Sequence, residues 1–171
     1  MNFFKHLFYS AGILMLISSC SSSSGPNTND YIISEDKRQS APDFSLESLS
    51  NGTQTLSEYS GKVVYLYFLG YNCPYCIADA PGTQSQVAEK YNSNDVQILG
   101  LDLWDGSVSS LTYFRSQTGV NYPLLLKASS IGNAYKAYND YSVIIDKKGR
   151  IAYRGGGVDI ARIQGVIDAL L

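Results

Sequence analysis

The sequence predicts one α/β domain, in which strands and helices alternate along most of the chain. The run from Lys62 to Leu69 is almost continuously apolar and rich in β-branched and aromatic residues, which is typical of a central strand buried on both faces. Helical patterns then alternate with further short apolar runs up to the C-terminus. With 171 residues, of which 44% are hydrophobic, the chain is long enough to bury one core of ordinary size.

The expected elements follow from local patterns. Ahead of the central strand, residues 41–49 and 54–56 predict an irregular β-hairpin with Asn51-Gly52 as its turn. The chain after Leu69 predicts a helix that begins at Cys73-Pro74-Tyr75-Cys76 and runs to about Tyr91. The remaining expected elements are a strand over 96–103, a helix over 107–117, a short strand over 124–126, a short helix over 131–138, a hairpin pairing 141–146 with 150–154, and a last helix that starts near Asp159.

Two of these helices carry apolar residues at helical spacing, so each predicts one buried face. In the helix over 107–117 the repeating residues are Val108, Leu111 and Phe114. In the last helix they are Ile160, Ile163, Ile167 and Leu170. No internal repeat or second domain is visible.

The N-terminus is typical of a targeting signal rather than of a folded element. Residues 1–19 predict a signal peptide, since Lys5 precedes an apolar stretch that is too short to span a bilayer. Leu16-Ile17-Ser18-Ser19-Cys20 resembles a bacterial lipobox, which would make Cys20 the first mature residue and the carrier of a lipid. A plain signal peptide with an incidental cysteine is the alternative. We expect residues 20–40, which begin with a serine run, to form a flexible tether, and residues 41–171 to form the domain.

Composition excludes several function classes. The net charge of -2, with 16% charged residues, leaves no basic surface for nucleic acid. The only histidine, His6, lies in the predicted signal peptide, so the mature chain has few soft ligands for a metal. We therefore expect no metal and no cofactor.

The candidate chemistry lies in Cys73 and Cys76, placed where the buried strand ends and a helix begins. Cys73 is expected at the N-cap with Pro74 at the first helical position, where unpaired backbone N–H groups and the helix dipole favour a thiolate. Cys76, one turn later, is expected to be the more buried thiol. An exposed Cys73 would attack the disulfide of a partner protein, and Cys76 would then attack Cys73 and release the reduced partner. A permanently closed disulfide or half of a metal site is the alternative.

Several segments, taken in their order along the chain, resemble those of thioredoxin-fold proteins. The resemblance is strongest to the tethered thiol-disulfide oxidoreductases of the TlpA and ResA kind. The segments are Ala41-Pro42-Asp43-Phe44, the stretch 59–64, Cys73-Pro74-Tyr75-Cys76 with Asp79 and Pro81, and the stretch 144–151. The resemblance covers residues 41–171 and implies a three-layer α/β/α domain with a central mixed sheet and an N-terminal β-hairpin extension.

The resemblance also suggests roles for residues around the dithiol. Asp79 stands where the family usually carries a glutamate near the second cysteine, so it is expected either to exchange a proton with Cys76 or simply to suit the helix dipole. Tyr71, Pro74, Tyr75 and Asp140 are expected to line a substrate groove. The family's cis-proline would fall near Asp140, and because a non-proline cis bond costs about 2.5–4 kcal/mol, this loop is expected to be trans or rebuilt. Tyr67 is expected to be a core residue.

The resemblance implies an enzyme that acts on disulfides of exported proteins, with reduction favoured over oxidation as the direction of the reaction. Its partners would be those proteins, a membrane thiol reductant that supplies electrons, and the membrane itself through the lipid on Cys20. The protein would lie in a bacterial cell envelope with its domain facing the periplasm or extracytoplasmic space. A peroxiredoxin-like thiol peroxidase is one alternative, although Gly70 stands where that family has a threonine three residues before the cysteine. A redox-inert binding lipoprotein is the other.

Overall fold

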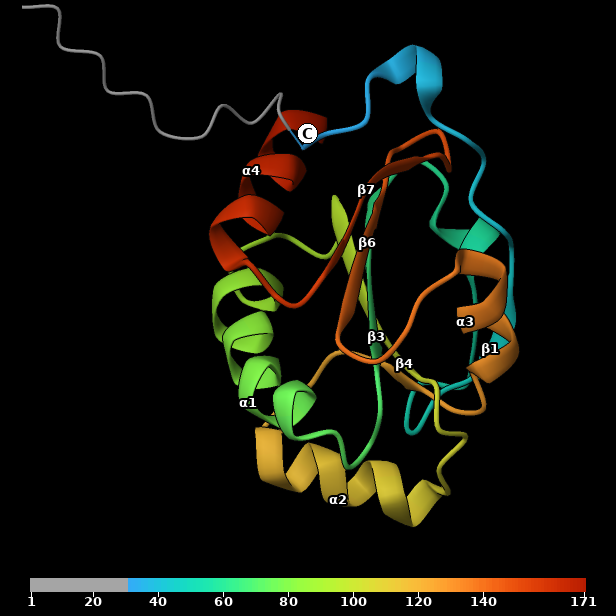
Figure 1. The fold of residues 1–171 in the computed structure, drawn as a ribbon, viewed down its shortest axis with the longest axis vertical. Helices are drawn as coiled ribbons and strands as arrows, with labels where there is room; N and C mark the ends of the chain where they lie inside the picture. The colour runs from blue at the N-terminus through green and yellow to red at the C-terminus, as the bar shows by residue number, and fades with distance from the viewer. Residues whose placement is uncertain (1–30) are drawn as a thin grey trace, which may run out of the picture.

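A computed structural model describes residues 31–171, which form a mixed five-stranded sheet with helices on both faces (Figure 1). The central strand pairs in parallel with one neighbour and antiparallel with the other. In spatial order the strands are β5 (Leu124–Leu125), β4 (Val96–Asp102), β3 (Val63–Leu69), β6 (Tyr141–Ile145) and β7 (Ile151–Gly156). The mixed sheet and its central strand confirm the prediction.

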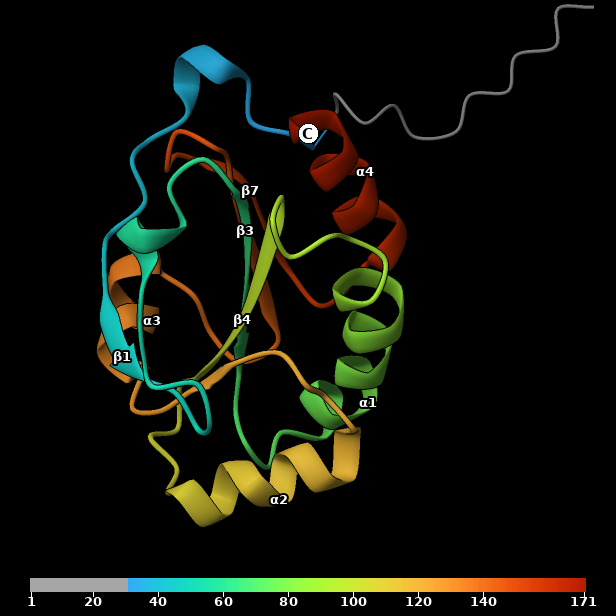
Figure 2. The ribbon, with the colours of Figure 1, turned by 180° about the vertical axis from the view of Figure 1, so that it is seen from behind.

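Helices and a small second sheet complete the layers. Helices α1 and α4 cover one face of the sheet, α3 and the small sheet β1–β2 cover the other, and α2 lies across one end (Figures 1 and 2). The helices are α1 (Pro74–Thr83), α2 (Val108–Thr118), α3 (Ser129–Tyr135) and α4 (Ile160–Leu170). The antiparallel pair β1 (Ser45–Glu47) and β2 (Thr53–Thr55) is the predicted N-terminal hairpin. Short helical turns occupy Glu35–Lys37, Leu56–Tyr59 and Gln84–Ala88.

All seven residues of β3 are buried, and their side chains alternate between two apolar clusters. Tyr65 and Tyr67 belong to the cluster under α1 and α4, together with both cysteines. Leu66 and Phe68 belong to the cluster under α3 and the small sheet. This period of two is what an extended strand imposes, so the sheet separates two cores.

One of the two predicted helix faces is wrong in part. Leu111 and Phe114 are fully buried, but Val108 is 59% exposed. Helix α2 lies across one end of the sheet (Figure 1), and Val108 is the first residue of this helix. In α4, Ile163 and Ile167 are buried as predicted. Ile160 and Leu170, near the ends of that helix, are only half-buried.

The segment from Tyr31 to Leu49 runs along both edges of the sheet. On one side, Ile33 N–H donates to the Ala152 carbonyl at 2.7 Å, and Ile151 N–H donates to the Gln39 carbonyl at 2.8 Å. On the other side, Leu49 N–H donates to the Leu124 carbonyl at 2.8 Å. Ordered contacts with the domain therefore begin before residue 41, inside the range that the sequence predicted as a tether.

The predicted signal peptide (residues 1–19), Cys20 and the first part of the tether lie outside the described residues. Within residues 31–171, none of the helices is long and apolar enough to cross a membrane.

A charged network fastens this N-terminal segment to the β6–β7 hairpin. Asp146 accepts from Arg38 at 3.1 Å and from Arg150 at 2.8 Å, and Arg150 also reaches Glu35 at 3.0 Å. Lys148 pairs with Glu35 at 2.8 Å. Lys148 and Arg150 lower the pKa of Glu35 to about 2. Burial alone would raise the pKa of Asp146, but the hydrogen bonds from Arg150 and Arg38 outweigh it, so the net shift is downward.

Acid should therefore loosen the N-terminal segment before the core. A carboxylate whose pKa is lowered by folding stabilises the native state above its unfolded pKa, and this contribution disappears as the pH falls through the folded value. For Glu35 that window runs from about 4.5 down to about 2. We expect the Ile33 amide to lose hydrogen-exchange protection in this window while amides of β3 keep theirs. A Glu35→Gln chain should show weaker protection already at neutral pH, and equal loss at Ile33 and in β3 would contradict the prediction.

Candidate active site

The two cysteines lie where β3 gives way to α1, as the sequence predicted. Cys73 is the N-cap of the helix, and Pro74 follows at its first position. The Cys73 sulfur accepts the backbone N–H of Cys76 at 3.3 Å, while the Cys73 N–H donates to the Gly70 carbonyl at 2.9 Å. Both cysteines are free thiols. The helix start thus supplies a hydrogen bond to Cys73 that it does not supply to Cys76.

The expectation of an exposed Cys73 is wrong. Cys73 is 5% exposed and Cys76 is fully buried, so the two thiols differ in access, but only slightly. A partner's sulfur could reach Cys73 only through the small part of this residue that is exposed. Pro74 and Tyr75, which follow in the first turn of α1, are exposed, and Tyr75 is 75% exposed.

The environment of Cys76 keeps this thiol protonated. Burial raises the pKa of Cys76 well above its usual range, and the side chain of Cys73 raises it further. The negative charge of Asp140 acts in the same direction, whereas hydrogen bonding with the Gly70 backbone partly offsets these effects. At neutral pH Cys76 is therefore a neutral thiol, and it must lose a proton before it can act as a nucleophile.

Two aromatic rings pack against glycines beside the dithiol. Trp104 packs over Gly70, where an added Cβ would come within 2.6 Å of the indole ring. Tyr71 packs on Gly106 in the same way and meets Trp104 edge to face, with 5.7 Å between ring centroids. The indole is 45% exposed, and the sequence pattern did not place it at the site. A threonine at position 70 would collide with this ring.

A buried carboxylate holds the two loops together. Asp102, at the end of β4, is fully buried. One of its oxygens accepts the N–H of Tyr71 at 3.1 Å and of Trp104 at 3.3 Å, and the other accepts the N–H of Gly106 at 2.6 Å. Burial raises the pKa of Asp102 despite these hydrogen bonds. The signal that could have identified it is an acidic residue within a buried apolar strand.

Asp79 and Asp140 approach the dithiol from different elements. Asp79 is half-buried, one turn beyond Cys76 on α1. Burial raises the pKa of Asp79, and the charge of Asp140 raises it further. Asp140 precedes β6, and its carboxylate accepts the hydroxyl of Tyr67 at 3.1 Å. Its peptide bond is trans, as expected, since none of the described residues has a cis bond.

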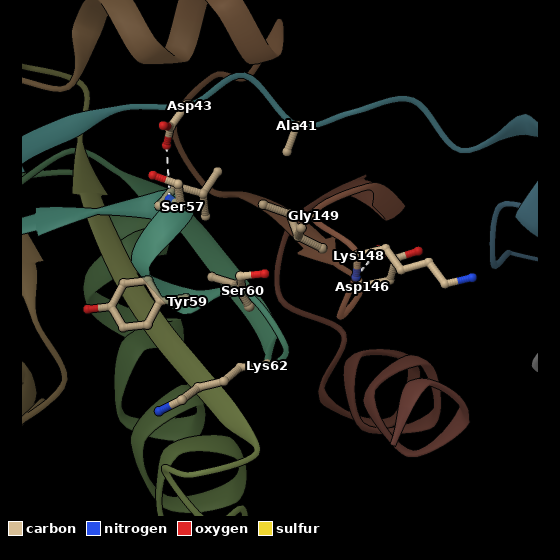
Figure 3. Close-up of a pocket in the computed structure, with 12 residues that line it drawn as sticks. Ala41, Asp43, Ser57, Tyr59, Ser60, Lys62, Asp146, Lys148 and Gly149 are labelled. Carbon is tan, nitrogen blue, oxygen red and sulfur yellow. Dashed lines mark hydrogen bonds between the residues drawn. The ribbon is translucent and has the colours of Figure 1, made fainter.

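A cavity of about 260 Å³ opens at the other end of β3 (Figure 3). Several of its charged side chains already have partners. The Asp43 carboxylate accepts the N–H of Ser57 at 3.0 Å, and Lys62 donates to the Ser93 carbonyl at 2.8 Å. Because Lys62 precedes β3 and Cys73 follows it, this cavity is separate from the dithiol.

Comparison with solved structures defines the class of protein. The chain resembles a proposed protein disulfide isomerase of Bacteroides thetaiotaomicron, with a TM-score of 0.68 and 27% identity over 77% of this chain and 85% of that one. It also resembles a protein described as the thiol:disulfide interchange protein DsbE of Chlorobium tepidum, with a TM-score of 0.68 and 25% identity over 80% of this chain and 99% of that one. The protein is thus a thioredoxin-like α/β domain with a dithiol at the start of α1.

Sequence comparison gives the family. Residues 38–154 match the AhpC/TSA family, and the chain belongs to it. The thiol-disulfide oxidoreductase ResA of Geobacillus kaustophilus is 29% identical over 113 residues, which are 65% of this chain and 64% of ResA. ResA of Bacillus subtilis is 30% identical over 86 residues, which are 50% of this chain and 47% of that protein. The chain therefore spans less than two thirds of the length of these curated relatives.

Proposed function

We propose that this protein is a thiol-disulfide oxidoreductase that reduces disulfides of exported proteins through Cys73 and Cys76. The observation that carries the proposal is the asymmetry of the two thiols. The Cys73 sulfur accepts a backbone N–H at the start of α1, whereas Cys76 is fully buried with a raised pKa. A nucleophile held ready beside a protonated resolving thiol is the arrangement that disulfide exchange requires. The names of the ResA and DsbE relatives support the same chemistry.

The reaction would proceed in two exchanges. The Cys73 thiolate attacks one sulfur of a partner's disulfide, the partner's S–S bond breaks, and its other sulfur leaves as a thiolate that takes up a proton from solvent. Cys76 then loses its proton and attacks the Cys73 sulfur, which closes the Cys73–Cys76 disulfide and releases the partner's second thiol. The partner gains two electrons and the dithiol loses two, so a membrane thiol reductant would have to reduce the disulfide again.

The surroundings of the dithiol suggest how a partner is held. Tyr71, Pro74, Tyr75 and Asp140 are proposed to contact the partner's chain next to its cysteine, and the exposed part of Trp104 extends this set. Asp79 is proposed to exchange a proton with Cys76. Anchoring through lipid on Cys20, with the domain facing the periplasm or extracytoplasmic space, is also part of the proposal. It is supported by the lipobox-like sequence at residues 16–20.

Trapping the mixed disulfide tests this function. In a full-length Cys76→Ser chain, the second exchange is blocked, so Cys73 should stay bonded to exported proteins that contain disulfides. The unmodified chain should instead show a reversible two-electron titration in thiol-disulfide buffers. A matched Cys73→Ser chain should trap nothing. Absence of both trapping and titration would contradict the proposal, and rapid peroxide consumption by the unmodified chain would favour the peroxidase alternative.

A further inference from the structure

The loop after β4 is fastened at two points. Asp102, at the end of the strand, is fully buried, and its carboxylate accepts the backbone N–H of Trp104 at 3.3 Å and of Gly106 at 2.6 Å. Between them lies Asp105, whose carboxylate accepts the backbone N–H of Ser129 at 3.0 Å and the Ser129 hydroxyl at 2.7 Å. The loop that carries the indole is therefore held both by the end of the sheet and by the start of α3.

The backbone after Trp104 adopts a conformation that few sequences accept. The φ of Asp105 is 51°, in the left-handed region, which aspartate tolerates better than most residues. Such conformations persist where surrounding contacts hold them, and they are common in loops that clamp ligands. Gly106 is restricted in another way, because a Cβ there would lie 2.5 Å from the ring of Tyr71. Both residues favour one course of the loop, and that course sets where Trp104 lies.

This loop places the indole of Trp104 beside the start of the dithiol. A Cβ added at Gly70 would lie 2.6 Å from the indole, so the ring packs closely on the glycine backbone. The carbonyl of the same Gly70 accepts the N–H of Cys73 at 2.9 Å. Tyr71 meets the indole edge to face, with 5.7 Å between the ring centroids, and 45% of the tryptophan remains exposed. The exposed part of a fixed apolar ring thus lies against the residue that holds the Cys73 N–H.

What this loop presents to a partner is mainly uncharged. The carboxylates of Asp102 and Asp105 are both engaged by N–H or hydroxyl donors of the protein itself. The indole offers a broad apolar face, and a ring that is already fixed loses little conformational entropy on binding. Tryptophan is accordingly frequent among the residues that contribute most to the free energy of binding at interfaces. An apolar side chain gains more than a polar one from burial against such a face.

We propose that Trp104 is a specificity-determining residue, which selects partner disulfides whose cysteine has an apolar neighbour in sequence. As Cys73 reaches the partner's sulfur, the side chain next to that cysteine packs on the exposed face of the indole. Asp102 and Asp105 are positioning residues, because they hold the ring in place before the partner arrives. This inference rests on the proposed function and names the substrate class of the same site.

Peptide probes measure this preference directly. Each probe is a symmetric disulfide of a short peptide whose cysteine is flanked on both sides by leucine, by serine or by lysine. The reduced full-length chain is mixed with excess probe, the reaction is quenched with acid, and the released peptide thiol is measured by chromatography. Each rate is divided by the rate of the same probe with 2-mercaptoethanol, which corrects for intrinsic reactivity. We expect the leucine probe to react about 10-fold faster than the serine probe, the lower end of what one apolar group contributes in a hydrophobic pocket. The lysine probe should react no faster than the serine probe.

Variants assign the preference to the indole and its loop. Trp104→Ala should lower the ratio of leucine to serine rates from about 10 to about 1. Tyr113→Ala is the matched control and should keep the ratio, since Tyr113 is similarly exposed, at 55%, but belongs to α2. Asp105→Ala removes both bonds to Ser129 and places alanine at a left-handed φ, so the ratio should fall several-fold. Asp105→Asn keeps the tolerance for this φ and an acceptor, and it should retain most of the preference.

The outcomes separate this inference from the proposed function. Failure of the unmodified chain to release thiol from any probe would contradict the function itself. Reaction with all probes at equal corrected rates would leave the function intact and overturn the role of Trp104. A ratio that Trp104→Ala leaves unchanged would also overturn it, because a general disturbance of the dithiol slows both probes alike. A faster reaction of the lysine probe would show selection by charge and overturn the apolar assignment.

Discussion

Replacing Cys73 with serine is expected to abolish both exchanges of the proposed reaction. Serine keeps the N-cap role, because its hydroxyl can accept the Cys76 N–H that the sulfur accepts at 3.3 Å. It lacks the thiolate, which is the attacking species, so no mixed disulfide can form. With dithiodipyridine as the disulfide substrate, each exchange releases one thiopyridone, which is followed by its absorbance. The release by Cys73→Ser should be no faster than that of a buffer blank. The loss should be complete because Cys76, fully buried and protonated, cannot replace Cys73.

The matched variant for this test is Cys76→Ser. It should release one thiopyridone at the wild-type rate of the first exchange, since only the second exchange needs Cys76. Far-UV circular dichroism should be the same for both variants, because Cys73→Ser preserves the cap. A second thiopyridone from Cys76→Ser, or any enzymatic release from Cys73→Ser, would show that the roles assigned to the two thiols are wrong.

Replacing Asp102 with alanine is expected to lower the free energy of unfolding by about 3 kcal/mol. The carboxylate accepts three backbone N–H groups, those of Tyr71, Trp104 and Gly106, and alanine leaves all three without their partner. Each buried donor that loses its acceptor costs about 1–3 kcal/mol, and partial access to water at two of these groups moderates the sum. Urea unfolding should show a lower midpoint with little change in slope.

Two comparisons make the Asp102 experiment specific. Asp102→Asn should fall between the wild type and Asp102→Ala, because its one oxygen accepts hydrogen bonds while its NH₂ group faces other donors. Asp95→Ala removes an exposed aspartate just before the same strand and should change stability by no more than about 0.5 kcal/mol. Equal destabilisation by Asp95→Ala and Asp102→Ala would mean that the three hydrogen bonds are not the cause.

Local patterns predicted the strands and most of the helices because burial on a strand or helix repeats with a fixed period. Other signals were local as well: β3 is one continuous apolar run, and the side chain of Asp159 caps the first turn of α4. The orientation of α2 is different: whether Val108 faces the core depends on where the whole helix is placed, and it lies across the end of the sheet. Helical spacing in the sequence identifies the residues that share one face of a helix. It does not show how much of that face lies over the core.

The site was predictable where neighbours in sequence make it, and not where distant segments do. Cys73, Pro74 and Cys76 form one helix start, so their arrangement follows from four consecutive residues. The contact between Tyr67 and Asp140 joins residues 73 positions apart and depends on the pairing of β3 with β6. The low exposure of Cys73 likewise depends on packing around the helix start rather than on the cysteine's own position.

The N-terminal segment that runs along both sides of the sheet has a consequence for how this protein avoids self-association. An uncovered edge strand presents unpaired N–H and C=O groups, and a second chain can pair with them and begin an aggregate. Here β7 is paired through Ile33 and Gln39 and β5 through Leu49, so one stretch of chain shields both edges. A shortened protein that starts at residue 41 would leave much of β7 open. Its tendency to aggregate should therefore rise even if its core and dithiol remained intact.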